Sequence, residues 1–303
     1  LASAAPGNPY SAAGPCEKDV KCPEATGWDK EARATVRTLI GGGLCTAALI
    51  NNARNDGTRY DWSAYHCGSM NNAVFLFKYE KSACGSGSAP TNNTLSGSVQ
   101  LASNSNVDYR LARITPTIPA SYNAYYMGWN RSASAIPSST VTIHHPDGDV
   151  KKWSKDNHAP SKSGVQWHIS QWDIGVTEPG SSGCPLFDQN HRFIGQLYGG
   201  QATCSFVFND YYGRFDQAWN TVKTWLDPDN TGVTTLDGFD PGMPTNCGSI
   251  VSYGAPGCAG SFGVVPNLGM SGCLNSGGSV TLSITLAVGP SSALLFFGNQ
   301  QAN

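Results

Sequence analysis

Short runs of apolar residues, several of them alternating with polar ones, recur along this 303-residue chain. Alternation with a period of two is typical of a β-strand with one face in the core, and Gly, Pro, Asn and Asp mark the turns between strands. The pattern therefore predicts an all-β fold, a barrel or sandwich with many tight loops. The runs cover residues 46–52, 73–80, 108–114, 124–130, 140–146, 193–200 and 205–210.

One stretch, DQAWNTVKTWLDP at 216–228, has helical spacing instead. Ala218, Val222 and Trp225 fall on one face of a helix, and Asp216 is placed to cap its first turn. We therefore expect the main domain to end on a helix.

The composition changes after this helix and suggests two domains. Residues 229–244 are rich in Gly, Asp, Thr and Pro, as linkers and domain edges are. We expect a first domain over 1–240, a linker over 241–246 and a small β-rich module over 247–303. Fifty-seven residues make a small core, so a disulfide between Cys258 and Cys273 would help this module to fold alone.

The most apolar segment runs from Ser279 to Gly298 within this module. Gly289 and Pro290 interrupt it, and its first half alternates Val, Leu and Ile with Thr and Ser. Two β-strands are therefore predicted here, and no membrane span.

The charge pattern argues against several partners. Charged residues make up 13% of the chain, the net charge is −2, and Lys and Arg form no dense run. The chain therefore lacks the basic surface that nucleic acid or an anionic membrane attracts. We expect a monomer that binds neither.

Ten cysteines in a chain of this length indicate an oxidising compartment, so we expect a secreted, extracellular protein. Zinc sites favour closely spaced cysteine pairs, whereas Cys16 and Cys22 are separated by five residues and the others lie farther apart. We expect no metal and no cofactor. The first ten residues lack a basic segment followed by an apolar one, so a secretion signal is expected to have been removed.

Three separate segments carry candidate catalytic residues. His66 stands directly before Cys67, and a disulfide from Cys67 to Cys45 would fix the loop that presents the imidazole. Asp108 opens a strand-like segment, where it either caps a turn or orients that imidazole. A single histidine or aspartate is more often structural than catalytic.

The turn GSSGCP at 180–185 offers a nucleophile. Its spacing lets the Ser182 hydroxyl project, with the N–H groups of Gly180 and Ser182 available to bind an oxyanion. The chain thus supplies a base, a carboxylate and a nucleophile in the order His66, Asp108, Ser182.

From about Cys16 to Asp240 the sequence resembles the chymotrypsin-fold serine peptidases, and more closely the bacterial lysyl endopeptidases. The resemblance implies a double β-barrel with a C-terminal helix, and it gives His66, Asp108 and Ser182 the roles of general base, orienting carboxylate and nucleophile. The motifs that carry it are CPE at 22–24, LINN at 49–52, HCG at 66–68, AIP to IHHP at 135–146, GVTEPGSSG at 175–183, GQLYGG at 195–200, DYYGR at 210–214 and WLDPDNTG at 225–232.

The resemblance also implies a substrate pocket. Val176 stands where trypsin-like enzymes have the pocket aspartate, and Asp210 matches the residue that lysyl endopeptidases use to bind a basic side chain. Gly199 and Gly200 match the wall along which substrate backbone pairs. Tyr198 departs from the family histidine, so cleavage after Lys is expected first and cleavage after Arg stays open.

Two residues near Ser182, Ser181 and Cys184, could also be considered as nucleophiles. Ser181 stands where animal trypsin-like enzymes have an aspartate that pairs with the new N-terminus, so activation here is not expected to need that ion pair. Cys184 is expected to be a disulfide partner or a buried thiol. The remaining histidines are expected to be structural; they are His144, His145, His158, His168 and His191.

The disulfides follow in part from the resemblance. It implies the pairs Cys16–Cys204, Cys22–Cys84 and Cys45–Cys67. The four remaining cysteines allow three connectivities. Of these we favour Cys258–Cys273, which leaves Cys184–Cys247 as a tether between domains.

These observations leave two classes of function. The first is a secreted serine endopeptidase that cleaves polypeptides after Lys, or Arg, through an acyl-enzyme on Ser182. The second is a catalytically silent peptidase fold used for binding or adhesion. Labelling by a fluorophosphonate separates the two.

Overall fold

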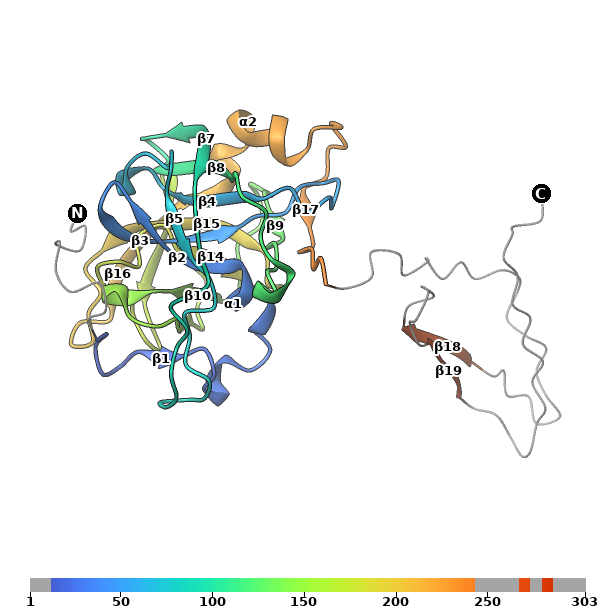
Figure 1. Cartoon of the computed structure of the whole chain (residues 1–303), viewed down its shortest axis with the longest axis horizontal. Coiled ribbons are helices and arrows are strands. Elements are labelled where there is room, and N and C mark those ends of the chain that lie inside the picture. Colours follow the sequence, from blue (N-terminus) through green and yellow to red (C-terminus); the bar gives the residue numbers. More distant parts are fainter. Residues whose placement is uncertain (1–11, 243–266, 273–279, 286–303) are drawn as a thin grey trace. The chain divides into compact units, whose positions relative to one another are not determined.

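The computed structural model describes residues 12–242, 267–272 and 280–285. It divides the chain into two compact units, 1–242 and 243–303 (Figure 1). The first unit consists mainly of two large sheets that are almost entirely antiparallel. The predicted all-β class is thus confirmed, and the two sheets fit the chymotrypsin-like double barrel that the resemblance implies.

The first sheet has seven strands from the N-terminal half of unit 1. Each of the seven predicted runs overlaps a strand of the two sheets, and three of them fall here. The order across this sheet is β6 (Thr94–Ser96), β5 (Val74–Leu76), β2 (Thr35–Ile40), β3 (Gly43–Leu49), β4 (Tyr60–Ala64), β8 (Tyr109–Ile114) and β7 (Ser98–Asn104).

The second sheet has ten strands. Its main path is β1 (Lys18–Asp19), β11 (Lys152–Asp156), β10 (Thr140–His144), β14 (Pro185–Asp188), β15 (Phe193–Gly200), β16 (Phe208–Arg214), β13 (Gln166–Gln171) and β12 (Ser161–Ser163). A short side branch joins β15 through β9 (Trp129–Asn130) and β17 (Thr235–Leu236).

The helices are few and short. The predicted helix is α2 (Phe215–Leu226), which packs on β15, β16 and β7 and buries Phe215, Ala218, Val222 and Leu226. Asp216 does not cap it, because its carboxylate instead accepts two hydrogen bonds from the guanidinium of Arg214. Among the described residues the other helices are α1 (Asp29–Ala34) and four 3₁₀ turns, η1 (Pro23–Ala25), η2 (Tyr65–Cys67), η3 (Ala120–Tyr122) and η4 (Pro146–Gly148).

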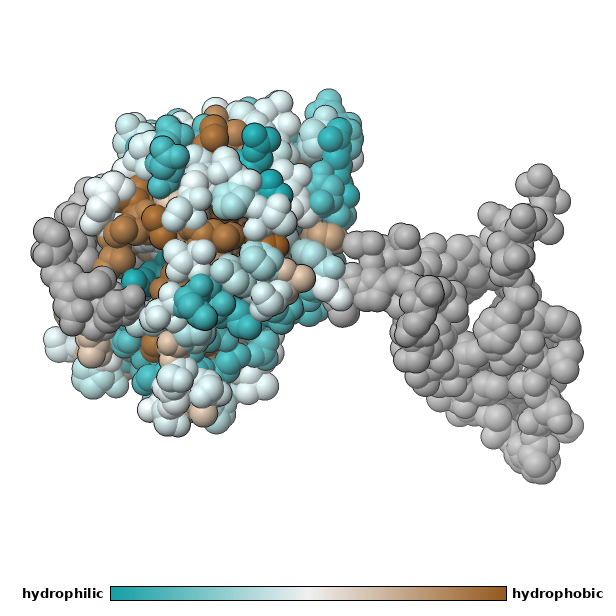
Figure 2. Space-filling view, in the orientation of Figure 1, coloured by the Kyte–Doolittle hydropathy of each residue, from teal (hydrophilic) through white to brown (hydrophobic). Residues whose placement is uncertain are grey.

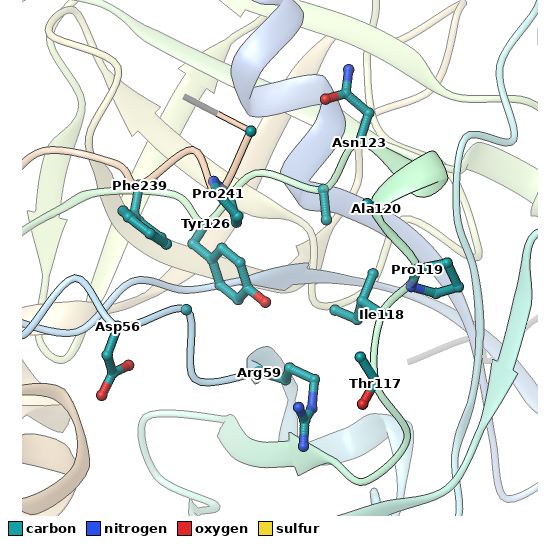
Figure 3. Close-up of a pocket in the computed structure, with 13 residues that line it drawn as sticks. Asp56, Arg59, Thr117, Ile118, Pro119, Ala120, Asn123, Tyr126, Phe239 and Pro241 are labelled. Atoms are coloured by element: carbon teal, nitrogen blue, oxygen red, sulfur yellow. The ribbon is translucent and has the colours of Figure 1, made fainter. Parts of the chain in front are cut away.

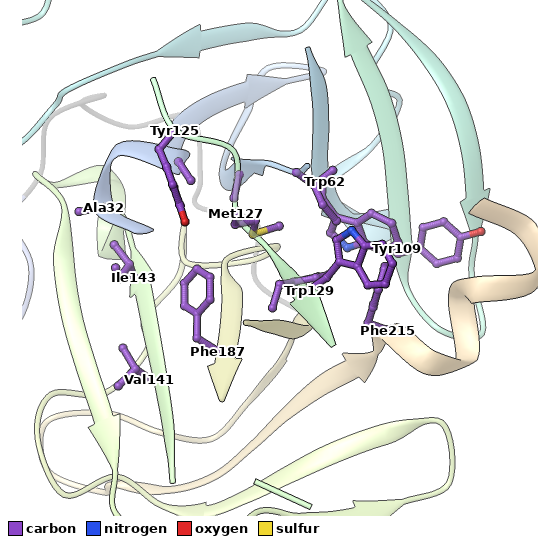
Figure 4. Packing of buried hydrophobic residues seen from close by; sticks show 14 of the residues in the cluster. Ala32, Trp62, Tyr109, Tyr125, Met127, Trp129, Val141, Ile143, Phe187 and Phe215 are labelled. Carbon is purple, nitrogen blue, oxygen red and sulfur yellow. The ribbon is translucent and has the colours of Figure 1, made fainter. Parts of the chain in front are cut away.

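The main core lies where the two sheets meet (Figure 4). Trp62 and Tyr109 come from the first sheet and stack with their ring centroids 4.8 Å apart, while Phe193 and Phe215 meet Trp62 edge-on. Burying an aromatic side chain of this size contributes about 1.5–3 kcal/mol. The Trp62 indole also donates to Gln196 on β15, so the two sheets are joined by a specific hydrogen bond.

The described part of unit 2 is one antiparallel pair, β18 (Asn267–Gly272) with β19 (Val280–Thr285). The strand predicted for the first half of 279–298 is therefore present. The second half, Cys247, Cys258, Cys273 and the end of the expected linker lie outside the described residues.

The face of unit 1 drawn in Figure 2 is mostly hydrophilic or intermediate, with a band of hydrophobic residues across its middle. None of the described helices combines the length and apolar character needed to cross a bilayer.

Candidate active site

His66 and Asp108 are brought together by the pairing of two neighbouring strands. His66 lies on η2 immediately after β4, and Asp108 immediately precedes β8. The antiparallel register places Ala64 opposite Tyr109, so both residues emerge at the same end of the ladder. Nδ1 of His66 lies 2.7 Å from Oδ2 of Asp108, and the backbone N–H of His66 donates to Oδ1 at 2.9 Å.

The backbone holds Asp108 in an unusual position. Its φ of 61° lies in the left-handed region, which non-glycine residues seldom adopt outside specific turns and functional sites. The Gln196 side chain donates to the Asp108 carbonyl at 3.1 Å, and this carbonyl also accepts from the N–H of Tyr65 at 3.0 Å. The carboxylate is only 3% exposed, so it is shielded from water beside the imidazole.

Ser182 stands on a tight turn between the two sheets. Its carbonyl accepts a hydrogen bond from the N–H of Thr46 on β3 at 2.9 Å, and the N–H of Gly183 donates to Leu197 on β15 at 3.0 Å. Gly183 has a φ of 82°, and a Cβ there would lie 2.3 Å from the Ser63 hydroxyl and 2.6 Å from the Thr46 carbonyl. Only glycine fits, which explains the Ser-Gly sequence.

Two N–H groups beside Ser182 are free to bind an anion. The carbonyl oxygens of Pro179 and Ser181 each accept a backbone hydrogen bond, at 2.6 and 2.9 Å. Because C=O and N–H point in opposite directions in a trans peptide, the N–H groups of Gly180 and Ser182 point away from those partners. Neither N–H donates to any acceptor within the described part of the chain. Two such donors can bind an oxyanion.

His66 and Ser182 line the same cavity of about 300 Å³. No hydrogen bond joins the Ser182 hydroxyl to His66 in the described structure, a separation that is common before substrate binds. All of the residues expected to contact substrate line this cavity as well. They are Tyr198, Gly199, Gly200 and Asp210.

Asp210 is a buried carboxylate held by three donors. It is 1% exposed, and its Oδ2 accepts hydrogen bonds of 2.7 Å from both the Trp172 indole and the Thr177 hydroxyl. The N–H of Ala202 donates to Oδ1 at 3.3 Å. Burial raises the pKa of Asp210, and the three hydrogen bonds oppose that shift. A Cβ at Gly200 would lie 2.0 Å from Oδ1, so glycine is required beside this carboxylate.

Trp172 is a functional candidate that the sequence analysis missed. It is 2% exposed and lies just beyond β13, whose strand pairs with the strand of Asp210. The sequence signal was a tryptophan four residues before Val176, but nothing local marked it as a partner of Asp210. Val176 itself is fully buried and is not among the residues that line the cavity.

Tyr198 lies at the rim between the cavity and the imidazole. Its ring meets that of His66 edge-on, with the centroids 6.2 Å apart. Tyr198 is partly exposed, so it is accessible to a substrate that enters the cavity.

Three disulfides join described residues, and they are the pairs that the resemblance implies: Cys16–Cys204, Cys22–Cys84 and Cys45–Cys67. Cys184 is a free and fully buried thiol, so the tether to Cys247 is wrong. Burial raises the pKa of the Cys184 thiol to about 12, which keeps it protonated and unreactive.

The other histidines lie outside the cavity lining. His191 stacks on Trp28, and His168 stacks on Tyr211. His144 and His145 are fully buried.

Asp156, His158 and Asp173 bring possible metal-ligand atoms within 4.8 Å of one another. Nδ1 of His158 lies 3.0 Å from Asp156 and 3.5 Å from Asp173. Both carboxylates also accept backbone N–H groups, so the cluster is stabilised by its own hydrogen bonds.

A second cavity, of about 350 Å³, lies elsewhere in unit 1 (Figure 3). Tyr126 and Phe239 form its apolar wall, and Arg59 and Asp56 lie at its edge. It contains none of the candidate catalytic residues.

Two comparisons of the sequence with known proteins found matches. A family model described as the C-terminal domain of lysyl endopeptidase matches residues 10–213. The lysyl endopeptidase of Pseudomonas aeruginosa is 27% identical over 247 residues, which cover 72% of this chain and 53% of that protein. The chain therefore spans about half the length of this curated relative.

Solved structures of proteases are also similar. The Rv3671c protease in an inactive form has a TM-score of 0.48 at 13% identity, covering 72% of this chain and 98% of that one. A thermostable serine protease, AL20, from an extremophilic microorganism has a TM-score of 0.46 at 13% identity, covering 63% and 96%.

Proposed function

Since this chain belongs to the lysyl endopeptidase family, we propose that it is a secreted serine endopeptidase that cleaves polypeptides after lysine. The observation that carries the proposal is one cavity lined by His66, Ser182 and the buried Asp210 carboxylate, with Asp108 hydrogen-bonded to the imidazole of His66. The three disulfides support an extracellular location.

In the proposed reaction, His66 takes the proton of the Ser182 hydroxyl as the oxygen attacks the substrate carbonyl. Asp108 holds the imidazole by its Nδ1–H and stabilises the positive charge that forms on it. His66 then gives the proton to the leaving amine, which leaves an acyl group on Ser182. Water hydrolyses this ester by the same steps in reverse order.

The N–H groups of Gly180 and Ser182 are proposed to bind the negative oxygen of the tetrahedral intermediate. Donors that are already oriented cost no reorganisation during the reaction, and removal of one such donor typically slows an enzyme by about 10²–10³-fold.

The hydrogen bonds of Asp210 support lysine over arginine. Each carboxylate oxygen has two lone pairs; Oδ2 uses both on Trp172 and Thr177, and Oδ1 uses one on Ala202. One acceptor site is left. A lysine ammonium can use a single site as a point charge, whereas a two-pronged arginine contact needs both oxygens.

The test is fluorophosphonate labelling combined with a series of peptide amides that carry Lys, Arg, Leu or Glu at the cleavage position. The proposal expects labelling that is lost in Ser182→Ala, and a higher kcat/KM for Lys than for Arg. Absence of labelling in the native protein favours the alternative, a silent peptidase fold that binds or adheres. Equal rates for Lys and Arg would refute the lysine preference but leave the peptidase intact.

A further inference from the structure

His144, in the IHHP motif, has no role in the proposed reaction, yet it is fully buried and both of its ring nitrogens are engaged. Nδ1 lies 2.7 Å from the Ser181 hydroxyl, directly before the proposed nucleophile. Nε2 lies 3.0 Å from the Ser154 hydroxyl on β11.

The directions of these hydrogen bonds follow from the donors at the two ends. The N–H of Glu178 donates to the Ser181 hydroxyl at 3.1 Å, so that hydroxyl is free to donate to Nδ1 of His144. At the other end the Ser154 hydroxyl donates to the Val176 carbonyl at 2.8 Å, so it accepts from Nε2–H. Every hydrogen is used once if His144 is neutral with its proton on Nε2.

Burial supports the neutral form. It lowers the pKa of His144 to about 3, so the ring carries no charge at ordinary pH.

The chain of hydrogen bonds begins and ends on one short segment, 176–181. This segment provides Thr177 to Asp210, and with Ser182 it provides the proposed oxyanion donors. A buried network attached to both ends of such a segment restricts its backbone more than either hydrogen bond alone.

The N-terminal segment packs against this network at the Nε2 side of His144. The Glu17 carboxylate lies 3.5 Å from Nε2 of His144, and neither of its oxygens has a hydrogen-bond partner in the described part of the chain. Burial raises the pKa of Glu17 well above its usual value. The Cys16–Cys204 disulfide and two hydrogen bonds from the Gly14 N–H to Glu178 keep this segment in place.

We propose that His144 is a positioning residue which, through the Ser181 and Ser154 hydroxyls, clamps segment 176–181 and so holds the oxyanion donors and the pocket wall in their working positions. The inference rests on the proposed peptidase function for its effect on turnover. The IHHP motif thereby gains a role: His144 holds the segment through the Ser181 hydroxyl, where animal trypsin-like enzymes use an ion pair of an aspartate.

The kinetic test uses the two ends of the clamp. Ser181→Ala is expected to lower kcat by about 10–100-fold with KM within about threefold, because that end holds the oxyanion donors. Ser154→Ala is expected to act mainly on KM, because that end holds the Val176 carbonyl beside the pocket. His144→Asn places its amide near Nδ1 and is expected to keep more kcat than His144→Gln, which reaches toward Nε2. Ser161→Ala, on an exposed residue of β12, is a surface control that should match the native enzyme.

The structural test does not depend on turnover. Hydrogen exchange measured by mass spectrometry on full-length protein with Ser182→Ala should show faster exchange in residues 176–184 when Ser181→Ala or His144→Gln is added. Exchange elsewhere should stay unchanged. Unchanged hydrogen exchange in residues 176–184 overturns the clamp. So does a kcat within about twofold of native in both Ser181→Ala and His144→Gln. If native protein neither labels nor cleaves, the peptidase proposal fails, and the exchange result still decides whether the clamp exists.

Discussion

The Trp172 indole donates a hydrogen bond of 2.7 Å to Asp210, from one strand-end to the neighbouring strand of the second sheet. A buried carboxylate that faces a cavity thus has one of its oxygens oriented by an aromatic side chain. The first three predictions concern this pair.

Asp210→Asn is expected to lower kcat/KM for a lysine substrate by at least about 30-fold, because removing one partner of a buried charge contact costs about 2–5 kcal/mol. Rates of fluorophosphonate labelling should stay close to native. Asp237→Asn is the control, since its side chain is 83% exposed and its change should leave kinetics unaltered. A variant that still prefers basic residues would contradict the pocket assignment.

Trp172→Phe is expected to raise KM for lysine substrates by about tenfold with little change in kcat, because loss of one hydrogen bond to a charged group costs about 1.5–3 kcal/mol. The aromatic ring keeps most of the packing, so the melting temperature serves as the check on folding. An unchanged KM would show that the indole does not orient the carboxylate.

Binding of basic ligands should weaken as the pH falls. Burial raises the pKa of Asp210, so this carboxylate gains its proton at a higher pH than an ordinary aspartate and then loses its attraction for a cation. Inhibition by n-butylamine, whose ammonium group mimics the end of a lysine side chain, should therefore weaken at the acidic end when Ki is measured from pH 4 to pH 8. The same profile in Asp210→Asn should be flat and weak; a native profile that is also flat would contradict the assignment.

The buried Asp61 on β4 is expected to lower the stability of the folded state as the pH rises. It is fully buried, neither carboxylate oxygen has a partner among the described residues, and burial raises its pKa well above the usual value. Because the pKa of Asp61 is higher in the folded state, its contribution to the free energy of unfolding is fully present below the pKa of the unfolded state. This contribution is lost as the pH rises toward the pKa of the folded state. The change in the free energy of unfolding caused by Asp61→Asn should thus be more stabilising at pH 8 than at pH 4, by at least about 1 kcal/mol. Urea unfolding at both pH values measures this; an equal change at both would refute it.

Cys184→Ala should keep fluorophosphonate labelling and lysine cleavage within about twofold of native, because the thiol is buried and protonated. Ser182→Ala should abolish both. Loss of labelling in Cys184→Ala, in protein with a native melting temperature, would assign the attack to the thiol instead.

Much of the fold was predictable because strand period and turn residues are local properties. Each of the seven runs overlaps a strand, and the 216–228 spacing gave the helix. The helix cap was wrong because Asp216 has a stronger partner in Arg214, two residues before it in sequence but outside the helical pattern. An ion pair of this kind depends on backbone direction at the strand end, which spacing does not reveal.

The candidate site was also predictable only where the signal is local in sequence. His66, Asp108 and Ser182 were proposed from sequence motifs, and the structure supplies the 2.7 Å contact between the first two. Trp172 and the His144 network could not be found in the same way. Their partners lie 38 and 37 residues away in sequence, and each contact exists only once the strands of the second sheet are paired.

The covalent link between Cys16 and Cys204 joins points 188 residues apart. If another copy of the enzyme cuts one exposed loop between them, the two pieces remain a single molecule until a reductant is added. Such a nicked protein would run at full length on a non-reducing gel and as fragments on a reducing one. Damage by self-digestion would therefore be invisible to size measurements made under oxidising conditions.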